Sequence, residues 1–177
     1  MPRTTWRLFY RLGDRTRSIQ SYKSAIDHYN EALMMSTKRN IEVLVNKSFS
    51  LFRLGKIYRE LQDYDNAKQN LEESIKITEN ILETMATKHP DALEHISYAY
   101  EELGMLYLDT GDLDKAENFL QRSIGYLDKL YEIIRAKQGE MFRLRKTKIF
   151  TKRVEISKML SKIRDMKQTK MTQQSSL

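Results

Sequence analysis

The residue types that carry out catalysis or bind metals are sparse in this chain and poorly spaced for either task. The three histidines are His28, His89 and His95. His89 and His95 are six residues apart, so a helix does not hold both on one face, as a shared metal ion would require. Motifs for phosphate-binding loops, dinucleotide binding, zinc proteases and serine hydrolases are absent from the sequence. We therefore expect a protein that is not an enzyme, with no metal and no cofactor.

Adjacent acidic residues are the other candidates for acid–base chemistry. They occur as Glu72–Glu73 and Glu101–Glu102. Neighbouring side chains diverge on a helix, so the two carboxyl groups of each pair cannot share a proton. We interpret both pairs as solvated surface. The chain has no cysteine, so it uses neither disulfide bonds nor thiol chemistry.

Positive charge near the C-terminus is a clearer chemical signal. The chain has a net charge of +7, but residues 1–139 carry 20 Lys and Arg against 21 Asp and Glu, whereas residues 140–170 carry 11 against 3. Such a cluster can attract an anionic partner. Its first half holds the candidate basic residues Arg143, Arg145, Lys146, Lys148, Lys152 and Arg153.

This cluster lies on a predicted amphipathic helix. Apolar residues recur at seven-residue steps, which predicts one helix over about residues 140–168 with a single apolar face, followed by a polar tail of residues 169–177. The repeated apolar positions are Phe142, Ile149, Ile156 and Ile163.

The rest of the chain contains an internal repeat. A Leu–Gly pair is followed by an Ala 12 residues after the glycine, and this pattern occurs three times. Two of the copies also place a Tyr three residues after the glycine. Repeats of roughly 20–50 residues indicate stacked structural units rather than one catalytic pocket. The copies are Leu12, Gly13 and Ala25; Leu54, Gly55, Tyr58 and Ala67; and Leu103, Gly104, Tyr107 and Ala116.

Each copy predicts a helical hairpin. A glycine costs roughly 1 kcal/mol inside a helix relative to alanine, so its recurrence indicates a place where the neighbouring helix comes close. The small residue 12 positions later faces that glycine across the hairpin. Ser21, Asp63 and Asp112 lie between the two positions and can cap the N-terminus of a second helix.

These residues resemble the tetratricopeptide repeat. The resemblance implies an all-α stack of helical hairpins, an α-solenoid, and the low content of glycine and proline agrees with it. The long spacing between copies and the His89–Pro90 dipeptide are similar to kinesin-light-chain repeats. The resemblance covers about residues 6–138, within a repeat domain of residues 1–139, with hairpins over about residues 6–37, 40–88 and 91–138.

The resemblance also implies where a partner binds, since the first helices of such repeats line a concave face. Arginine and aromatic residues on that face are suited to anchor a protein segment that carries acidic and apolar residues. The opposing interpretation is that the aromatic residues are packed, with the terminal helix folded into the groove. The candidate partner-binding residues are Tyr10, Arg11, Phe49, Phe52, Arg53, Lys56, Tyr98 and Met105.

The C-terminal tails of heat-shock chaperones are not the expected ligand. Relatives that bind such tails use a clamp of Lys, Asn and Arg side chains. At the corresponding places this sequence has Tyr10, Asp14, Arg53, Tyr98 and Glu102. The two acidic residues among these would repel a C-terminal carboxylate.

We therefore expect a non-catalytic scaffold or adaptor, working in a larger assembly because three repeats are near the minimum for a stable stack. The alternative is a binder of anionic surfaces, nucleic acid or membrane, or a subunit-assembly factor, that acts through the basic terminal helix. That helix can also cap the open end of the stack. No apolar run approaches the roughly 20 residues that span a bilayer, so we expect a cytoplasmic location, with the nucleus and the mitochondrion as alternatives.

Overall fold

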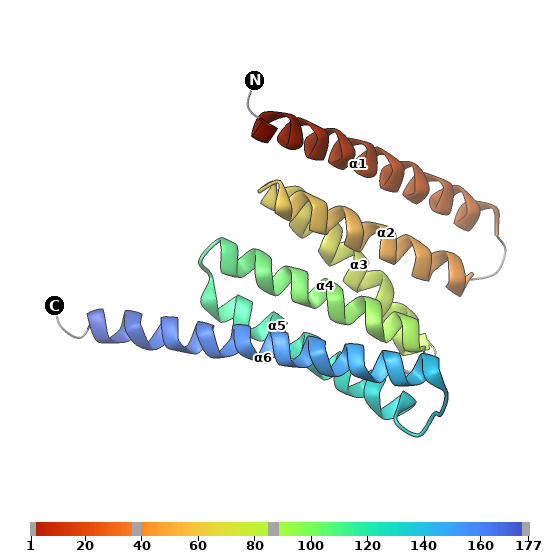
Figure 1. The fold of residues 1–177 in the computed structure, drawn as a ribbon. Helices are drawn as coiled ribbons and strands as arrows, with labels where there is room; N and C mark the ends of the chain where they lie inside the picture. Colours follow the sequence, from red (N-terminus) through yellow and green to blue (C-terminus); the bar gives the residue numbers. More distant parts are fainter. Residues whose placement is uncertain (1–2, 37–39, 85–88, 175–177) are drawn as a thin grey trace. The chain divides into compact units, whose positions relative to one another are not determined.

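The computed structural model describes the backbone of residues 3–36, 40–84 and 89–174, and the side chains from residue 13 to residue 173 within those ranges. Every regular element in these ranges is an α-helix, which confirms the predicted all-α class (Figure 1). The helices are α1 (Arg3–Met35), α2 (Ile41–Glu60), α3 (Tyr64–Thr84), α4 (Pro90–Asp109), α5 (Leu113–Ile134) and α6 (Glu140–Gln174).

The helices group into two compact units. Unit one spans Met1–Ile81 and holds α1, α2 and most of α3, and unit two spans Leu82–Leu177 and holds α4, α5 and α6. Each unit contains one helical hairpin, α2–α3 in unit one and α4–α5 in unit two. The two hairpins are built alike, as the repeated sequence predicts.

The same turn closes both hairpins. A residue with positive φ comes first, Gln62 with φ 62° in unit one and Gly111 with φ 83° in unit two. An aspartate follows it, and its Oδ1 accepts the backbone N–H three residues ahead, at 3.2 Å for Asp63 and 3.1 Å for Asp112. Both aspartates are thus the helix N-caps that the sequence predicts.

The interior of each hairpin depends on the repeated glycine. A Cβ atom on Gly55 would lie 2.7 Å from Leu71 Cγ, and one on Gly104 would lie 2.7 Å from Leu120 Cγ. Carbon atoms in contact are normally about 3.5–4.0 Å apart, so a larger residue would force the two helices away from each other. The alanines that the repeat places opposite the glycines are fully buried, as expected.

A second repeated contact lies seven residues before each glycine. Ser74 Oγ of α3 donates to the backbone carbonyl of Ser48 in α2 at 2.8 Å, and Ser123 Oγ of α5 donates to that of Ser97 in α4 at 2.7 Å. All four serines are buried. Because a buried hydroxyl group without a partner is costly, these bonds favour one register of each second helix against its first helix.

α1 differs from the predicted first hairpin over residues 6–37. It is one continuous helix that runs through Gln20–Ser21, where the sequence predicts a turn. The Ser21 hydroxyl does not cap a helix but donates to the carbonyl of Arg17, one turn earlier, at 2.9 Å. A Cβ on Gly13 would meet nothing within 4 Å among the described residues. The prediction of a hairpin in the first copy is therefore wrong.

The first copy lacks the residues that close the other two hairpins. At the place of Leu71 and Leu120 it has Tyr29, and Gly13 has no neighbour within 4 Å among the described residues, so the glycine contact is not made. At the place of the serines that donate between helices it has Ala32, which has no hydroxyl to donate. With neither contact available, and with no proline inside α1, a continuous helix pairs more backbone groups than a turn would.

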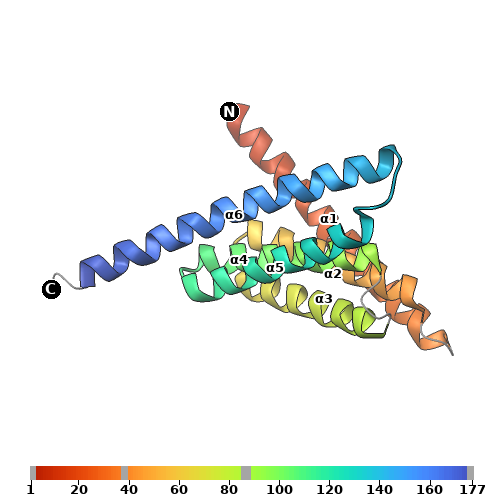
Figure 2. The same ribbon diagram turned by 90° about the horizontal axis from the view of Figure 1, so that it is seen from below.

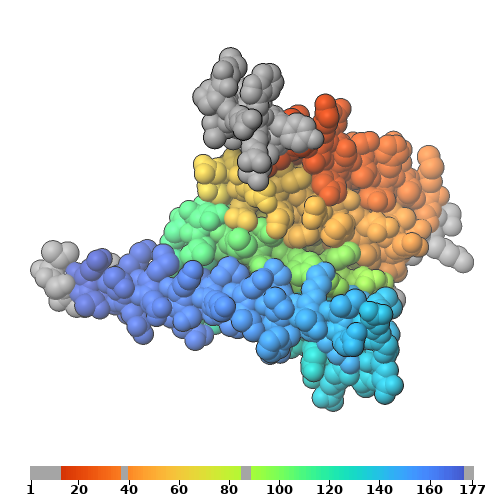
Figure 3. Space-filling model, in the orientation of Figure 1, coloured from red at the N-terminus to blue at the C-terminus, as the bar shows by residue number. Residues whose placement is uncertain are grey.

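α6 packs on α5 in unit two and carries the predicted apolar stripe, with Ile149, Ile156 and Ile163 buried. It continues to Gln174, past residue 168 where the sequence predicts a tail, because that polar segment has neither glycine nor proline. Figure 2 shows its C-terminal end running beyond the α4–α5 turn. The side of α6 that faces the viewer in Figure 3 is not covered by any other part of unit two.

Substituting Gly104 by alanine should destabilise the protein, whereas the same change at Gly125 of α5 should not. An added Cβ at Gly125 meets nothing within 4 Å, so alanine there should raise stability by up to about 1 kcal/mol through helix propensity. At Gly104 the added methyl group overlaps Leu120, so we expect a loss of about 1–3 kcal/mol. Urea melts of the two variants measure the difference. Equal stabilities would contradict the close approach of α4 and α5.

Candidate interaction surfaces

The predicted partner-binding residues of unit one include two cations on α2. Arg53 is exposed, and its Nε donates to the hydroxyl of Tyr22 on α1 at 3.1 Å. Lys56, one turn later, is half-buried. Arg15 of α1 forms an ion pair with Glu60 of α2 at 2.9 Å. These contacts tie α1 to α2 and leave the Arg53 guanidinium group at the surface.

The other candidates in unit one are less accessible or fall outside the described side chains. The repeat register predicts that the ring of Phe52 points outward. This prediction is wrong, because Phe52 is only 6% exposed. Its ring centroid lies 5.9 Å from that of Phe49, which is half-buried. Tyr10 and Arg11 belong to α1, but their side chains are outside the described residues. Phe49 is thus the only one of the two phenylalanines that offers an appreciable apolar contact.

In unit two, Tyr98 of α4 lies under α6 rather than open to a partner. Its hydroxyl donates to Glu94 Oε1 at 2.9 Å. The ammonium groups of Lys148 and Lys152 lie 5.3 and 6.0 Å from the centre of its ring, within the range of a cation–π contact. The structure therefore agrees with the packed interpretation of this aromatic residue. Met105, the remaining candidate on α4, is half-buried.

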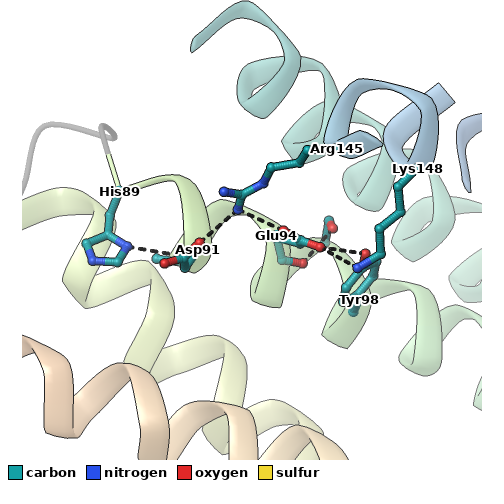
Figure 4. Close-up of polar contacts among 8 residues, drawn as sticks. His89, Asp91, Glu94, Tyr98, Arg145 and Lys148 are labelled. Carbon is teal, nitrogen blue, oxygen red and sulfur yellow. Dashed lines mark hydrogen bonds and ion pairs between the residues drawn. The ribbon is translucent and has the colours of Figure 1, made fainter. Parts of the chain in front are cut away.

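Basic residues of α6 pair with acidic residues of α4, and Glu94 is at the centre of the group (Figure 4). Its Oε2 accepts from Arg145 at 2.7 Å, and its Oε1 accepts from Lys148 at 2.8 Å. Hydrogen bonds between charged groups are stronger than neutral ones. Two further pairs between these helices are Arg145–Asp91 at 2.8 Å and Lys152–Glu101 at 3.2 Å. Glu101 is 7% and Glu102 is 4% exposed, so the interpretation of this acidic pair as solvated surface is wrong.

Acidic residues of α5 form further ion pairs with basic residues of α6. Three basic residues spread along α6 reach acidic residues at both ends of α5, so the two helices are joined along most of their length. The pairs are Arg153–Asp128 at 2.8 Å, Arg164–Glu117 at 3.3 Å, and Lys167 with both Asp114 and Glu117 at 2.6 Å.

The two remaining predicted basic residues, Lys146 and Arg143, are held differently. Lys146 Nζ donates to the backbone carbonyls of Arg135 and Lys137, at 2.8 Å each. These carbonyls follow the last turn of α5, where helical carbonyls lack intrahelical partners. Arg143 approaches only Glu140 of its own helix, at 4.0 Å, and both side chains are exposed. All six predicted basic residues thus have a polar partner inside unit two.

The source of these acidic partners is the third repeat. Residues 1–139 are nearly neutral as a whole, but residues 91–138 hold ten Asp and Glu against five Lys and Arg. The charge of α6 is therefore complementary to the hairpin that it covers. A count of charge repeat by repeat, rather than over the whole repeat domain, is the signal in the sequence that predicts this contact.

The ion pairs also change the acidity of their members. Burial raises the pKa of Glu94, but the hydrogen bonds from Lys148 and Tyr98 and the charge of Arg145 outweigh it, so the pKa lies below its usual 4.5. The hydrogen bond with Glu94 raises the pKa of Lys148. Both shifts favour the charged forms, so the contact between α4 and α6 is strongest at neutral pH.

The two hairpins define a helical-repeat protein, because the same turn, glycine contact and serine bond recur at corresponding places. The tetratricopeptide repeat model matches residues 50–81 and 97–126. These two segments are tetratricopeptide repeats, and the resemblance seen in the sequence is confirmed for them. The similarity to kinesin-light-chain repeats stays a prediction. Comparison with curated proteins gives no match.

None of the helices in the described ranges combines the length and the apolar character that crossing a membrane requires. Among the described side chains, no three or more His, Cys, Asp or Glu are placed to hold a metal ion. His89 instead caps α4, where its Nδ1 accepts from the backbone N–H of Ala92 at 3.2 Å (Figure 4).

Replacing Glu94 by Gln should weaken the packing of α6 on α4 by about 1–2 kcal/mol, because charge-assisted hydrogen bonds are lost. The folded-state pKa of Glu94 lies below the usual 4.5, so the charge contributes stability above that value and loses it as the pH falls through the folded-state pKa. Urea melts near neutral pH should therefore separate the parent from the variant, and melts well below the folded-state pKa should bring them together. A gap that persists in acid would contradict this assignment.

Proposed function

We propose that the protein is a non-catalytic interaction module that binds a segment of a partner protein on the α1–α2 face of unit one. Tetratricopeptide repeats in general mediate protein–protein interactions. The finer proposal concerns the side chains that bind. The observation that carries it is Arg53, which is exposed on a first helix and bonded to Tyr22 of α1.

Arg53 has the features of an interface anchor. Its Nε donates to the Tyr22 hydroxyl at 3.1 Å, which restricts the rotamers of the side chain before a partner arrives and so lowers the entropy lost on binding. The terminal nitrogens of its guanidinium group have the geometry for a bidentate pair with a carboxylate. Lys56, three residues later, adds positive charge to the same face of α2.

The charge of this face favours an acidic partner segment. The second half of α2 carries Arg53, Lys56 and Arg59 against a single acidic residue, Glu60, which already pairs with Arg15. A segment with carboxylates spaced by one helical turn would match Arg53 and Lys56. Its apolar side chains would contact Phe49, since Phe52 is buried.

Replacing Arg53 and Lys56 together by Glu should reduce the capture of the partner by the full chain at least about tenfold. The two new carboxylates would repel the acidic residues of the partner that Arg53 and Lys56 attract. The matched control is Lys68→Glu with Lys76→Glu, the same change of charge at exposed positions of α3. Quantitative mass spectrometry of the proteins retained by each immobilised chain measures the effect. Equal retention by both variants would place the binding surface elsewhere.

The alternative function, binding of nucleic acid, a membrane or another anionic surface through α6, has weaker support. Arg145, Lys148 and Lys152 already form ion pairs with α4, and Arg153 forms one with α5. An anionic partner would have to compete with these carboxylates. The ion pairs favour a role for α6 as the helix that caps unit two. The outer face of α6 could still take part in subunit assembly.

Replacing Lys146, Lys148, Lys152 and Arg153 by Gln distinguishes the two roles of α6. We expect a loss of stability of about 1–3 kcal/mol, because several ion pairs with partly buried carboxylates disappear together. Binding to single-stranded DNA or to vesicles that contain anionic lipid should be weak in the parent chain and should change little. Unchanged stability together with a salt-sensitive loss of anion binding would favour the alternative.

A further inference from the structure

We propose that the outer face of α6 in unit two receives an acidic, amphipathic helix of a partner protein, seated where the second helix of a further hairpin would pack. This surface is separate from the α1–α2 face and uses other residues. We call it the outer groove, and its principal lining residues are Tyr131 of α5 and Phe150, Val154 and Ser157 of α6.

The outer groove consists of two adjoining hollows. One, of about 450 Å³, is lined by Phe150, Val154 and Ser157 with basic residues beside them. The other, of about 380 Å³, extends from Phe150 to Tyr131. Phe150 and Arg153 line both hollows, so the two are continuous. Phe150 is 65% exposed and Val154 is 37% exposed, which leaves an apolar floor open to solvent.

Residues that line the outer groove occupy the same positions in α6 as the residues by which α4 binds α5. Counted from the first residue of each helix, Ser97 and Gly104 are the eighth and fifteenth residues of α4, and Thr147 and Val154 are the eighth and fifteenth residues of α6. In α4 these two positions make the serine bond and the glycine contact with α5. In α6 the same positions line the outer groove.

The eleventh position of each helix shows the difference between a filled and an unfilled face. In α4 it is Tyr100, which is 1% exposed and stacks on Phe119 and Tyr126 of α5 with ring centroids 6.0 and 5.6 Å away. In α6 it is the exposed Phe150. α6 therefore exposes the face that corresponds to the one by which α4 binds α5, with Val154 at the place of Gly104, and nothing in the described part of unit two covers it.

Small side chains allow another helix to come close. Ser157 and Ser161 line the groove and are four residues apart, so they lie on one face of α6 at successive turns. Neither carries an aliphatic group, so a helix can come close to α6 at these turns, whereas beside Val154 it must lie farther from α6 than α5 lies from α4 at Gly104. A helix seated there would cover the ring of Phe150 and remove its apolar surface from water.

The charge of the groove identifies its occupant as acidic. Arg153 and Lys158 line it, and Lys162 follows Lys158 by one turn. Lys158 and Lys162 are exposed and form no ion pair within the described part of the chain. A two-fold dimer formed through this groove would bring together two copies of the basic α6, which would repel each other. A helix with carboxylates along the edges of its apolar face is complementary instead.

The test uses a synthetic helix as the probe. The probe has the 22-residue sequence of α5 (Leu113–Ile134), with Lys115, Arg122 and Lys129 replaced by Glu. It keeps the apolar face that binds a first helix and gains acidic charge. We expect the full chain to bind this peptide, as measured by fluorescence anisotropy, and to bind a peptide of the same composition in scrambled order at least about tenfold more weakly.

Two pairs of substitutions locate the bound peptide. Phe150→Ala with Val154→Ala removes the apolar floor, and Lys158→Glu with Lys162→Glu reverses the charge of the edge. Each pair should weaken binding at least about tenfold, because both the apolar contact and the charge contribute. All four side chains are exposed, so circular dichroism and thermal melts should match those of the parent chain.

The control is Met141→Ala with Leu144→Ala, which removes two exposed apolar side chains of α6 outside the groove. Its affinity for the peptide should stay within about twofold of the parent value. The proposal is overturned if the parent does not bind the peptide, or if the control loses as much affinity as the groove variants. It is also overturned if the parent is a dimer that Phe150→Ala dissociates, because a second copy would then occupy the groove. A third contrary result is that the parent binds only anionic vesicles and that the apolar substitutions leave this binding unchanged.

Discussion

The approach of two helices at a glycine is the contact on which the rest of this structure depends. In each hairpin a leucine of the second helix occupies the space that a Cβ on the glycine would need. The serine bond seven residues earlier then admits only one register. Where both contacts are present the chain folds back on itself, and where the first copy lacks their residues it forms one long helix.

The register of the α4–α5 hairpin also determines where α6 binds. It places acidic residues of both helices, such as Glu94 of α4 and Glu117 of α5, within reach of basic residues of α6. The isoleucine stripe of α6 is buried at the same time. Apolar burial and charge pairing therefore act on the same helix, and the like charges of α6 that would repel in isolation are balanced by the hairpin beneath it.

Much of the fold could be predicted from the sequence, because the repeat register depends on local residue types. The capping aspartates, the buried alanines and the apolar stripe of α6 all follow from spacing. The continuous α1 could not be predicted from the Leu–Gly–Ala pattern alone, since the first copy carries that pattern and still forms one helix.

The candidate site was harder to predict than the fold. The repeat register predicts which helix face carries Arg53 and Tyr98, but it does not predict which other residues cover that face. The structure shows that Lys148 lies over the ring of Tyr98. Phe52 was expected at the surface because its place in the repeat is an outward one, yet it is buried. Contacts made by residues far apart in the sequence decide such burial, and a repeat pattern contains no information about them.

The two hairpin turns have unequal conformational energies. Gln62 holds a left-handed backbone conformation that disfavours a residue with a Cβ by about 1–2 kcal/mol, whereas Gly111 adopts it freely. The α4–α5 turn is therefore formed readily by its own residues and can bring its helices together. The α2–α3 turn needs the buried contacts of its helices to hold it. The two repeats thus share one architecture but differ in how much the turn itself contributes to the stability of the hairpin.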